Sequence, residues 1–144
     1  MRRYLLDTGP LGAYLQGRPA VIELVTPWLE RRKASTSILA YAEVVEYIKG
    51  FPQFSNLHAQ LHRLLCQVYP YFLTYHILER YADIRRTLRR PHGPGLIGDI
   101  DTLIAATALE RNLTVVTIDR NFQRIPNLRV VLLSRTTMEV LSSP

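Results

Sequence analysis

Four acidic residues occupy positions from which a side chain can do chemistry. Asp7 directly follows a short apolar run and Asp119 directly follows a longer β-branched one, so each is expected at the carboxyl end of a buried strand. Ligands of open parallel sheets bind in the crevice beyond those strand ends. Glu43 and Asp101 fall in helical stretches, and a helix that begins at Asp101 can bring its first turn to the same crevice. The four carboxylates are therefore predicted to meet in one site.

Carboxylates that meet in one site repel one another. Two of them about 4 Å apart cost roughly 4 kcal/mol at an effective dielectric constant of 20. Protonation relieves part of this repulsion, but a hard divalent cation relieves it at neutral pH and prefers oxygen ligands, whereas zinc favours histidine and cysteine. A bound Mg²⁺ or Mn²⁺ lowers the pKa of a water molecule and stabilises charge as a phosphodiester is attacked. The pattern favours metal-dependent phosphodiester hydrolysis, with one ion or two.

Each of these acids also has an ordinary structural explanation when it is taken alone. Asp7 suits the cap of a following helix, and Asp101 suits the positive end of a helix dipole. Glu43 suits the solvated face of a helix, and Asp119 suits a turn. Only the joint pattern of the four favours a catalytic site.

The elements that must position these acids alternate between strand and helix. Strands are expected at 4–6, 34–36, 71–74, 113–118 and 129–133. Helices are expected near 10–15 and over 20–32, 38–49, 57–68, 77–89 and 102–111, with a terminal half-helix at 136–141. Ser37 and Asn56 are the expected N-caps of two of these helices. This alternation predicts an α/β fold with a parallel sheet covered on both faces, in a single domain over residues 1–144.

The charge of the chain favours a polyanionic substrate or partner. The net charge is +6, and arginine, whose planar guanidinium pairs well with phosphate, supplies nearly all the cations. An arginine-rich face can also be simply solvated or paired with an acidic protein. The main basic surface is expected on the helix over 77–89 and just beyond it, at Arg85, Arg86, Arg89 and Arg90.

Other features bear on the compartment. The basic N-terminus is followed by too short an apolar run for a signal peptide or membrane span, so no membrane association is expected. Cys66 is the only cysteine, and its apolar neighbours predict a buried thiol with no disulfide partner. We therefore expect a cytoplasmic protein.

Four segments together resemble the PIN-domain nucleases, especially the VapC-type toxins of toxin–antitoxin pairs. The resemblance spans residues 5 to about 131 in the family's order, and the third of its segments is the most specific. The segments are Leu-Leu-Asp-Thr at 5–8, Tyr-Ala-Glu-Val at 41–44, Ile-Gly-Asp-Ile-Asp-Thr-Leu-Ile-Ala-Ala-Thr-Ala at 97–108 and Thr-Ile-Asp-Arg-Asn-Phe at 117–122.

The resemblance implies a three-layer α/β/α sandwich and a Mg²⁺- or Mn²⁺-dependent endoribonuclease that a cognate antitoxin inhibits. It also implies a homodimer, which is common in the family. By resemblance, the metal ligands are Asp7, Glu43, Asp101 and Asp119, with Asp99 as a secondary candidate. Thr8 and Thr117 are implied to orient water or a carboxylate. The arginine surface after residue 77 is then expected to hold an RNA backbone or an acidic segment of the antitoxin.

Several alternatives remain open from the sequence. The same acids suit an RNA-processing or DNA-directed nuclease outside a toxin–antitoxin pair. An inactive RNA- or protein-binding module is a different class, and the presence of all four acids argues against it. A phosphoacceptor domain would want a lysine after a late strand, and the only lysines are Lys33 and Lys49.

Some further residue types invite weaker hypotheses. His58 and His62 have the spacing of a helical zinc pair but lack a third ligand, so a surface or interface pair is favoured. The tyrosines at 69, 71 and 75 favour core or dimer-interface roles over base stacking. Glu46 favours a solvated helix position.

Overall fold

The central sheet has five strands, all parallel. The computed structural model describes residues 1–135 and orders the strands β3-β2-β1-β4-β5. Their bounds are β1 Tyr4–Leu6, β2 Ala34–Ser37, β3 Tyr69–Tyr71, β4 Thr114–Thr117 and β5 Val130–Leu132. The chain builds outward from β1 to β2 and β3, then returns to add β4 and β5 on the other side of β1. The strand order therefore switches between β1 and β4, which is where an open parallel sheet forms its ligand crevice.

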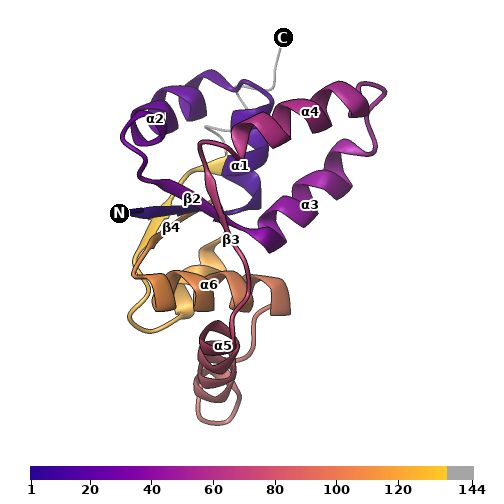
Figure 1. Cartoon of the computed structure of the whole chain (residues 1–144). Helices are drawn as coiled ribbons and strands as arrows, with labels where there is room; N and C mark the ends of the chain where they lie inside the picture. Colours follow the sequence, from indigo (N-terminus) through magenta and orange to yellow (C-terminus); the bar gives the residue numbers. More distant parts are fainter. Residues whose placement is uncertain (136–144) are drawn as a thin grey trace.

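Six α-helices cover the two faces of this sheet (Figure 1). Helices α1 to α4 pack among themselves on one face, whereas α6 covers the opposite face with α5 packed on its outer side. The bounds are α1 Thr8–Leu15, α2 Pro19–Glu30, α3 Ile38–Ile48, α4 Phe54–Leu64, α5 Tyr75–Leu88 and α6 Asp99–Arg111, with a 3₁₀ helix η1 at Arg120–Arg124. The predicted three-layer α/β/α sandwich is confirmed.

The core buries the apolar residues of the two central strands. Leu5 and Leu6 of β1 point to opposite faces and are fully buried, as are Val115 and Val116 of β4. Helix α6 presents small side chains to the sheet, including Ala105, and so approaches it closely. Because both central strands are locked by burial on both faces, the residues that follow them have defined positions.

Most expected elements are present, but several boundaries differ. The N-cap at Ser37 is confirmed, since its hydroxyl accepts a hydrogen bond from the Leu39 amide. The expected cap at Asn56 is wrong, because α4 already begins at Phe54. Helix α5 begins at Tyr75, two residues earlier than expected, because the Thr74 hydroxyl accepts from the Ile77 amide.

Other boundaries depend on packing that the pattern did not reveal. The third strand pairs through Tyr69–Tyr71 and not through 71–74, since its register is set by β2. Helix α6 begins at Asp99, so Asp101 lies inside its first turn. The 3₁₀ helix η1 after Asp119 was not expected, and the half-helix predicted at 136–141 lies outside the described residues.

The burial prediction for Cys66 was wrong, because its thiol is exposed beyond the end of α4 although its neighbours are apolar. Of the tyrosines expected in the core or at a dimer interface, Tyr71 packs against the core, whereas Tyr69 and Tyr75 are exposed, and a dimer-interface role for these two stays a prediction. The buried stripe of α5 runs through Ile77 and Ile84, and Leu78 is exposed. No helix within residues 1–135 has the length and apolar character needed to cross a membrane.

Candidate metal-dependent active site

Asp7 and Thr117 lie side by side because β1 and β4 are parallel neighbours. Leu6 pairs with Val116 in the register, and the Asp7 amide donates to the Val116 carbonyl at 3.0 Å. The next residue on each strand therefore reaches the same edge of the sheet. There the Thr117 hydroxyl donates to Asp7 Oδ2 at 2.8 Å, which fixes the orientation of the carboxylate.

The Asp7 carboxylate is buried, with only 7% of the residue exposed. Its Oδ1 atom has no hydrogen-bond partner among the residues that the structure describes. Burial raises the pKa of Asp7, and the nearby charges of Glu43 and Asp119 raise it further, against the lowering effect of bonds from Thr117 and Thr8. A buried carboxylate oxygen without a partner is costly, so this atom is a strong candidate ligand for a cation.

Glu43 is held toward Asp7 by the first residue of α1. Helix α3 carries Glu43 on a half-buried position, and the Thr8 hydroxyl donates a short hydrogen bond to its Oε1 atom. Thr8 directly follows Asp7, so one short segment orients two carboxylates. Both threonines that the resemblance singled out thus bond to a carboxylate, Thr8 to Glu43 and Thr117 to Asp7.

Asp101 lies close enough to the other three carboxylates for their charges to affect its pKa. Its pKa is raised to about 7, mainly by burial and then by the charges of Asp7 and Asp119, by a hydrogen bond with Asp119, and by the charge of Glu43. The opposing effect is its place in the first turn of α6, where the helix dipole favours an anion. Burial and the neighbouring carboxylates together outweigh this benefit, so the pKa of Asp101 is raised.

Asp119 completes the cluster from the end of β4. Its amide donates to the Thr117 hydroxyl at 3.0 Å, and its Oδ1 atom accepts from the Asn121 amide at 2.8 Å. Asp119 therefore has the structural role expected of a turn residue, since its side chain caps η1. The same carboxylate also hydrogen-bonds Asp101, so the structural and site roles coexist.

The four acids form what we call the carboxylate cluster: Asp7, Glu43, Asp101 and Asp119. Oxygen donors without histidine or cysteine suit a hard cation such as Mg²⁺ or Mn²⁺. Within residues 1–135, no three acidic, histidine or cysteine side chains stand in a ready-made metal-ligand arrangement. Mg²⁺ commonly takes only one or two protein carboxylates and keeps several waters, so the donor set and the unpartnered Asp7 Oδ1 fit this kind of site.

Comparison with protein-family models identifies the fold. The model of the PIN domain matches residues 4–128, which include all four acids. The chain belongs to the PIN-domain family. Proteins of this family are nucleases and generally use divalent metal ions.

Several solved structures have a similar fold. The DNA-bound VapBC from Salmonella typhimurium matches with a TM-score of 0.80 and 22% identity, over 91% of this chain and 98% of that one. VapBC-1 from nontypeable Haemophilus influenzae matches with a TM-score of 0.76 and 25% identity, over 90% and 96%. A toxin–antitoxin complex from Klebsiella pneumoniae matches with a TM-score of 0.67 and 22% identity, over 89% and 95%. A comparison with curated protein sequences finds no match.

Asp99 of this PIN domain lies apart from the carboxylate cluster. Its Oδ1 atom accepts hydrogen bonds from the Tyr81 hydroxyl at 2.9 Å and from Arg85 at 2.8 Å, and its side chain is 68% exposed. Residues two apart on a helix face different directions, so Asp99 points toward α5 while Asp101 points into the cluster. Its contacts tie α5 to α6. They also occupy one of the four arginines expected on the basic surface.

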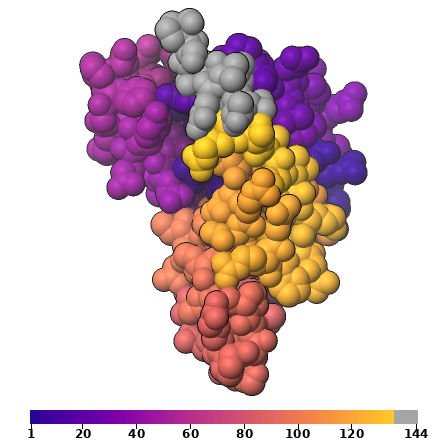
Figure 2. Space-filling model, turned by 180° about the vertical axis from the view of Figure 1, so that it is seen from behind, coloured from indigo at the N-terminus to yellow at the C-terminus, as the bar shows by residue number. Residues whose placement is uncertain are grey.

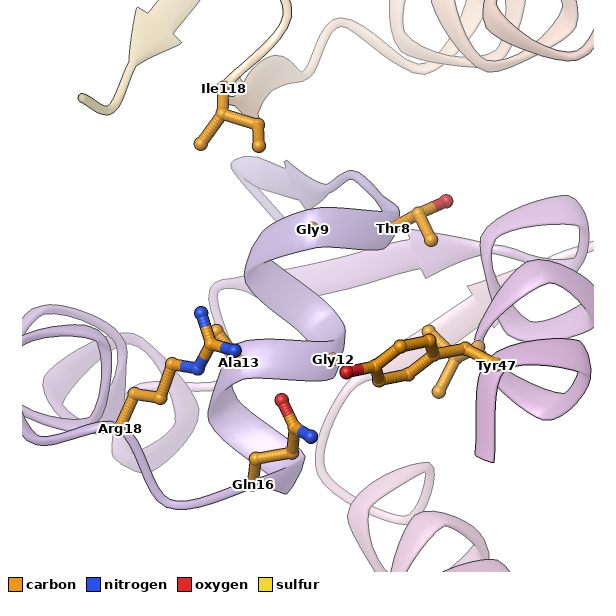
Figure 3. Close-up of a pocket in the computed structure, with 9 residues that line it drawn as sticks. Thr8, Gly9, Gly12, Ala13, Gln16, Arg18, Tyr47 and Ile118 are labelled. Atoms are coloured by element: carbon orange, nitrogen blue, oxygen red, sulfur yellow. The ribbon is translucent and has the colours of Figure 1, made fainter. Parts of the chain in front are cut away.

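A mostly apolar pocket of about 270 Å³ adjoins the carboxylate cluster (Figure 3). Tyr47, one turn beyond Glu43 on α3, points toward Gly12 of α1, and Ile118 closes the opposite end. This pocket was not expected from the sequence. The available signal was the spacing of Gly9 and Gly12, which leaves one side of α1 without side chains.

The histidine pair lies on α4, next to Tyr41 of α3. The rings of His58 and His62 are 4.5 Å apart, and His62 Nε2 lies 3.0 Å from the Tyr41 hydroxyl. No third ligand joins them within the described part of the chain. Glu46 is exposed on α3, as expected for a solvated helix residue.

Proposed function

We propose that this PIN domain is a divalent-metal-dependent endoribonuclease and the toxin of a VapBC-type toxin–antitoxin pair. The main support for this proposal is the buried Asp7 carboxylate. One of its oxygens has no hydrogen-bond partner among the described residues, and it lies near the charges of Glu43, Asp101 and Asp119. Such a group of anions is stable at neutral pH only when a cation or protons neutralise it. The net charge of +6 supports a polyanionic substrate.

The proposed mechanism assigns each residue a physical task. Asp7 and Asp101 would hold Mg²⁺ or Mn²⁺, with help from Glu43 and Asp119. The ion, when bound, would supply an activated water and stabilise charge on the attacked phosphate. Thr117 keeps the Asp7 carboxylate in one orientation. Thr8 does the same for Glu43. Burial and the neighbouring carboxylates raise the pKa of Asp101 to about 7, and Asp101 would hold the cation in its deprotonated form.

The toxin assignment rests on the structural neighbours. The Klebsiella pneumoniae match is itself a toxin–antitoxin complex, and the Salmonella typhimurium match is a VapBC complex bound to DNA. We propose that a cognate antitoxin binds at the apolar pocket beside the carboxylate cluster, where the exposed Tyr47 side chain offers contact area. An antitoxin bound there would block access of the substrate to the cluster. Homodimer formation and a cytoplasmic location also remain proposals.

The decisive experiment is a cleavage assay with matched RNA and DNA. We expect the purified protein to cut single-stranded RNA with Mn²⁺ or Mg²⁺ and to stop when EDTA is added. Asp7→Ala and Asp101→Asn should abolish cutting, whereas Asp83→Asn, which removes an exposed carboxylate on α5, should not. Undiminished cutting by both cluster variants would refute the mechanism. Cutting of DNA but not RNA would favour the DNA-directed alternative.

A further inference from the structure

The loop after α5 builds a basic pocket that the carboxylate cluster does not use. The sequence Pro-His-Gly-Pro-Gly at 91–95 folds back onto the end of the helix, where the Gly93 amide donates to the Arg89 carbonyl and the Gly95 amide donates to the Leu88 carbonyl at 2.7 Å. A Cβ on Gly93 would lie 2.1 Å from the Thr87 carbonyl oxygen, so only glycine fits this close approach. The loop is therefore a packed part of the fold.

Two arginines from distant parts of the sequence converge on Gly95. A Cβ at this position would lie 3.2 Å from Arg90 Nε and 3.3 Å from an Arg124 guanidinium nitrogen. Gly95 also has a φ of +118°, a conformation that side chains of L-residues rarely adopt. Glycine here leaves room for both guanidinium groups. With Arg89 they line an open pocket of about 420 Å³, which we call the arginine pocket.

The arginine pocket lacks a neutralising acid. Among residues 1–135, the ion pairs join Arg80 to Glu110 and Arg85 to Asp99, and none involves Arg89, Arg90 or Arg124. Two neighbouring guanidinium groups repel unless an anion lies between them. Of the arginines expected on the basic surface, Arg85 is paired with Asp99, whereas Arg86, Arg89 and Arg90 form no ion pair among residues 1–135.

The arginine pocket and the carboxylate cluster share the segment that contains η1. Arg124 donates to the Gly95 carbonyl at 2.6 Å and to Asn121 Oδ1 at 3.3 Å. The Asn121 amide in turn donates to Asp119 of the cluster. At about 2 Å rise per residue, η1 separates Asp119 from Arg124 by roughly 10 Å. A strand held at the pocket would thus reach the cluster within a few nucleotides. In Figure 2 the salmon end of α5 lies below the orange segments.

We propose that Arg90 and Arg124, with Arg89 at the rim, bind a backbone phosphate of the RNA strand that is cut at the carboxylate cluster. The proposal rests on the proposed function and adds a substrate-positioning site to it. Guanidinium groups pair with phosphate oxygens through two parallel hydrogen bonds, and Arg124 is already held in place by its bonds to Asn121 and Gly95. Because these contacts reach no base, the site contributes affinity and register without sequence preference.

The test measures binding of a short fluorescein-labelled single-stranded RNA as a function of salt. All proteins carry Asp101→Asn, so that the RNA is not cut, and Kd is determined by anisotropy from 50 to 300 mM salt. Arg90→Ala with Arg124→Ala should weaken binding and lower the slope of log K against log salt by about 0.7 for one lost phosphate contact. Because Arg124 bonds its neighbours, Arg90→Ala alone provides a milder variant, which should change the slope in the same direction.

A matched control removes two charges elsewhere. Arg31 follows α2 and Arg63 lies on α4, both exposed and on the other side of the sheet from α5 (Figure 1). Arg31→Ala with Arg63→Ala should leave the slope unchanged. An equal fall in both double variants would mean a general charge effect and would overturn the site, as would an unchanged slope in the arginine-pocket variants.

The outcomes also separate this proposal from the proposed function. If the wild-type protein does not cut RNA and the Asp101→Asn protein does not bind it, the endoribonuclease assignment fails. If the wild type cuts RNA while the arginine-pocket variants bind RNA with the same salt slope as Asp101→Asn alone, only the phosphate site fails. Loss of binding to an acidic antitoxin peptide without loss of RNA binding would overturn the site in favour of a protein partner.

Discussion

Removing the charge of Asp101 should stabilise the metal-free protein. The pKa of Asp101 is raised from its usual 3.8 to about 7, chiefly by burial and by the charges of Asp7 and Asp119. A raised carboxyl pKa means that the folded state binds the proton more tightly than the unfolded state. The contribution of Asp101 to stability is therefore greatest at low pH and is lost as the pH rises from about 4 through 7. Asp101→Asn keeps the shape and avoids that loss.

The magnitude follows from the same pKa values. At full strength the difference between 3.8 and about 7 corresponds to roughly 4 kcal/mol. Asp101 is only half-buried, so solvent screening reduces this energy, and we expect a gain of roughly 1–2 kcal/mol at pH 8. For a chain of 144 residues this raises Tm by roughly 3–8 °C. At pH 5 most of the wild-type repulsion is already relieved by protonation, so the gain should fall below half.

The assay is thermal or urea unfolding of protein treated with EDTA, at pH 5 and pH 8, followed by the same measurement with Mn²⁺. Mn²⁺ at a hundred times its Kd should stabilise the wild type by about 2.7 kcal/mol and the variant much less. Asp99→Asn is the matched control, because it removes a carboxylate from the same helix turn but outside the cluster. If Asp101→Asn gives no gain at pH 8, or an equal gain at pH 5, the four carboxylates do not repel one another as argued.

Three further predictions concern the supporting residues. Thr117→Val should lower the free energy of unfolding by about 1–3 kcal/mol, because Asp7 Oδ2 and the Asp119 amide each lose a hydrogen-bond partner. Calorimetry should show Mn²⁺ binding weakened roughly tenfold or more. Unchanged Mn²⁺ binding would contradict an orienting role for Thr117. Arg85→Ala should lower the free energy of unfolding by less than about 1 kcal/mol, because its partner Asp99 is largely exposed. The cleavage rate should stay within twofold of the wild type. A large loss of rate would place Asp99 in the mechanism. Mn²⁺ affinity should rise between pH 6 and pH 8, because Asp101 loses its proton over this range. Calorimetric titration with Mn²⁺ in two buffers of different ionisation enthalpy should show that binding releases protons. A pH-independent Kd would argue against Asp101 as a ligand.

The amino-acid sequence alone determined the architecture and the candidate acids. Apolar runs that end in Asp7 and Asp119 predict buried parallel strands, and strand pairing confirms that both runs lie in the centre of the sheet. The third segment of the resemblance marks Asp101, and the helix there does present it to the cluster. These features are local in sequence, since a strand pattern and a residue at its end can be recognised without knowing what packs against them.

Tertiary structure decided the roles that depend on contacts between distant residues. The sequence pattern does not distinguish Asp99 from Asp101. The packing of α5 against α6 shows that Asp99 accepts hydrogen bonds from Tyr81 and Arg85, whereas Asp101 faces the other acids. Cys66 has apolar neighbours in sequence yet lies exposed beyond the end of α4.

The same holds for the two pockets. Gly95 brings Arg90 next to Arg124, although the two arginines are far apart along the chain. The apolar pocket beside the cluster likewise forms between α1 and α3, with Ile118 at its end. Sequence patterns report which face of an element is apolar, whereas a pocket or a pairing depends on which other element covers that face. Only the assembled sheet and its helices establish that.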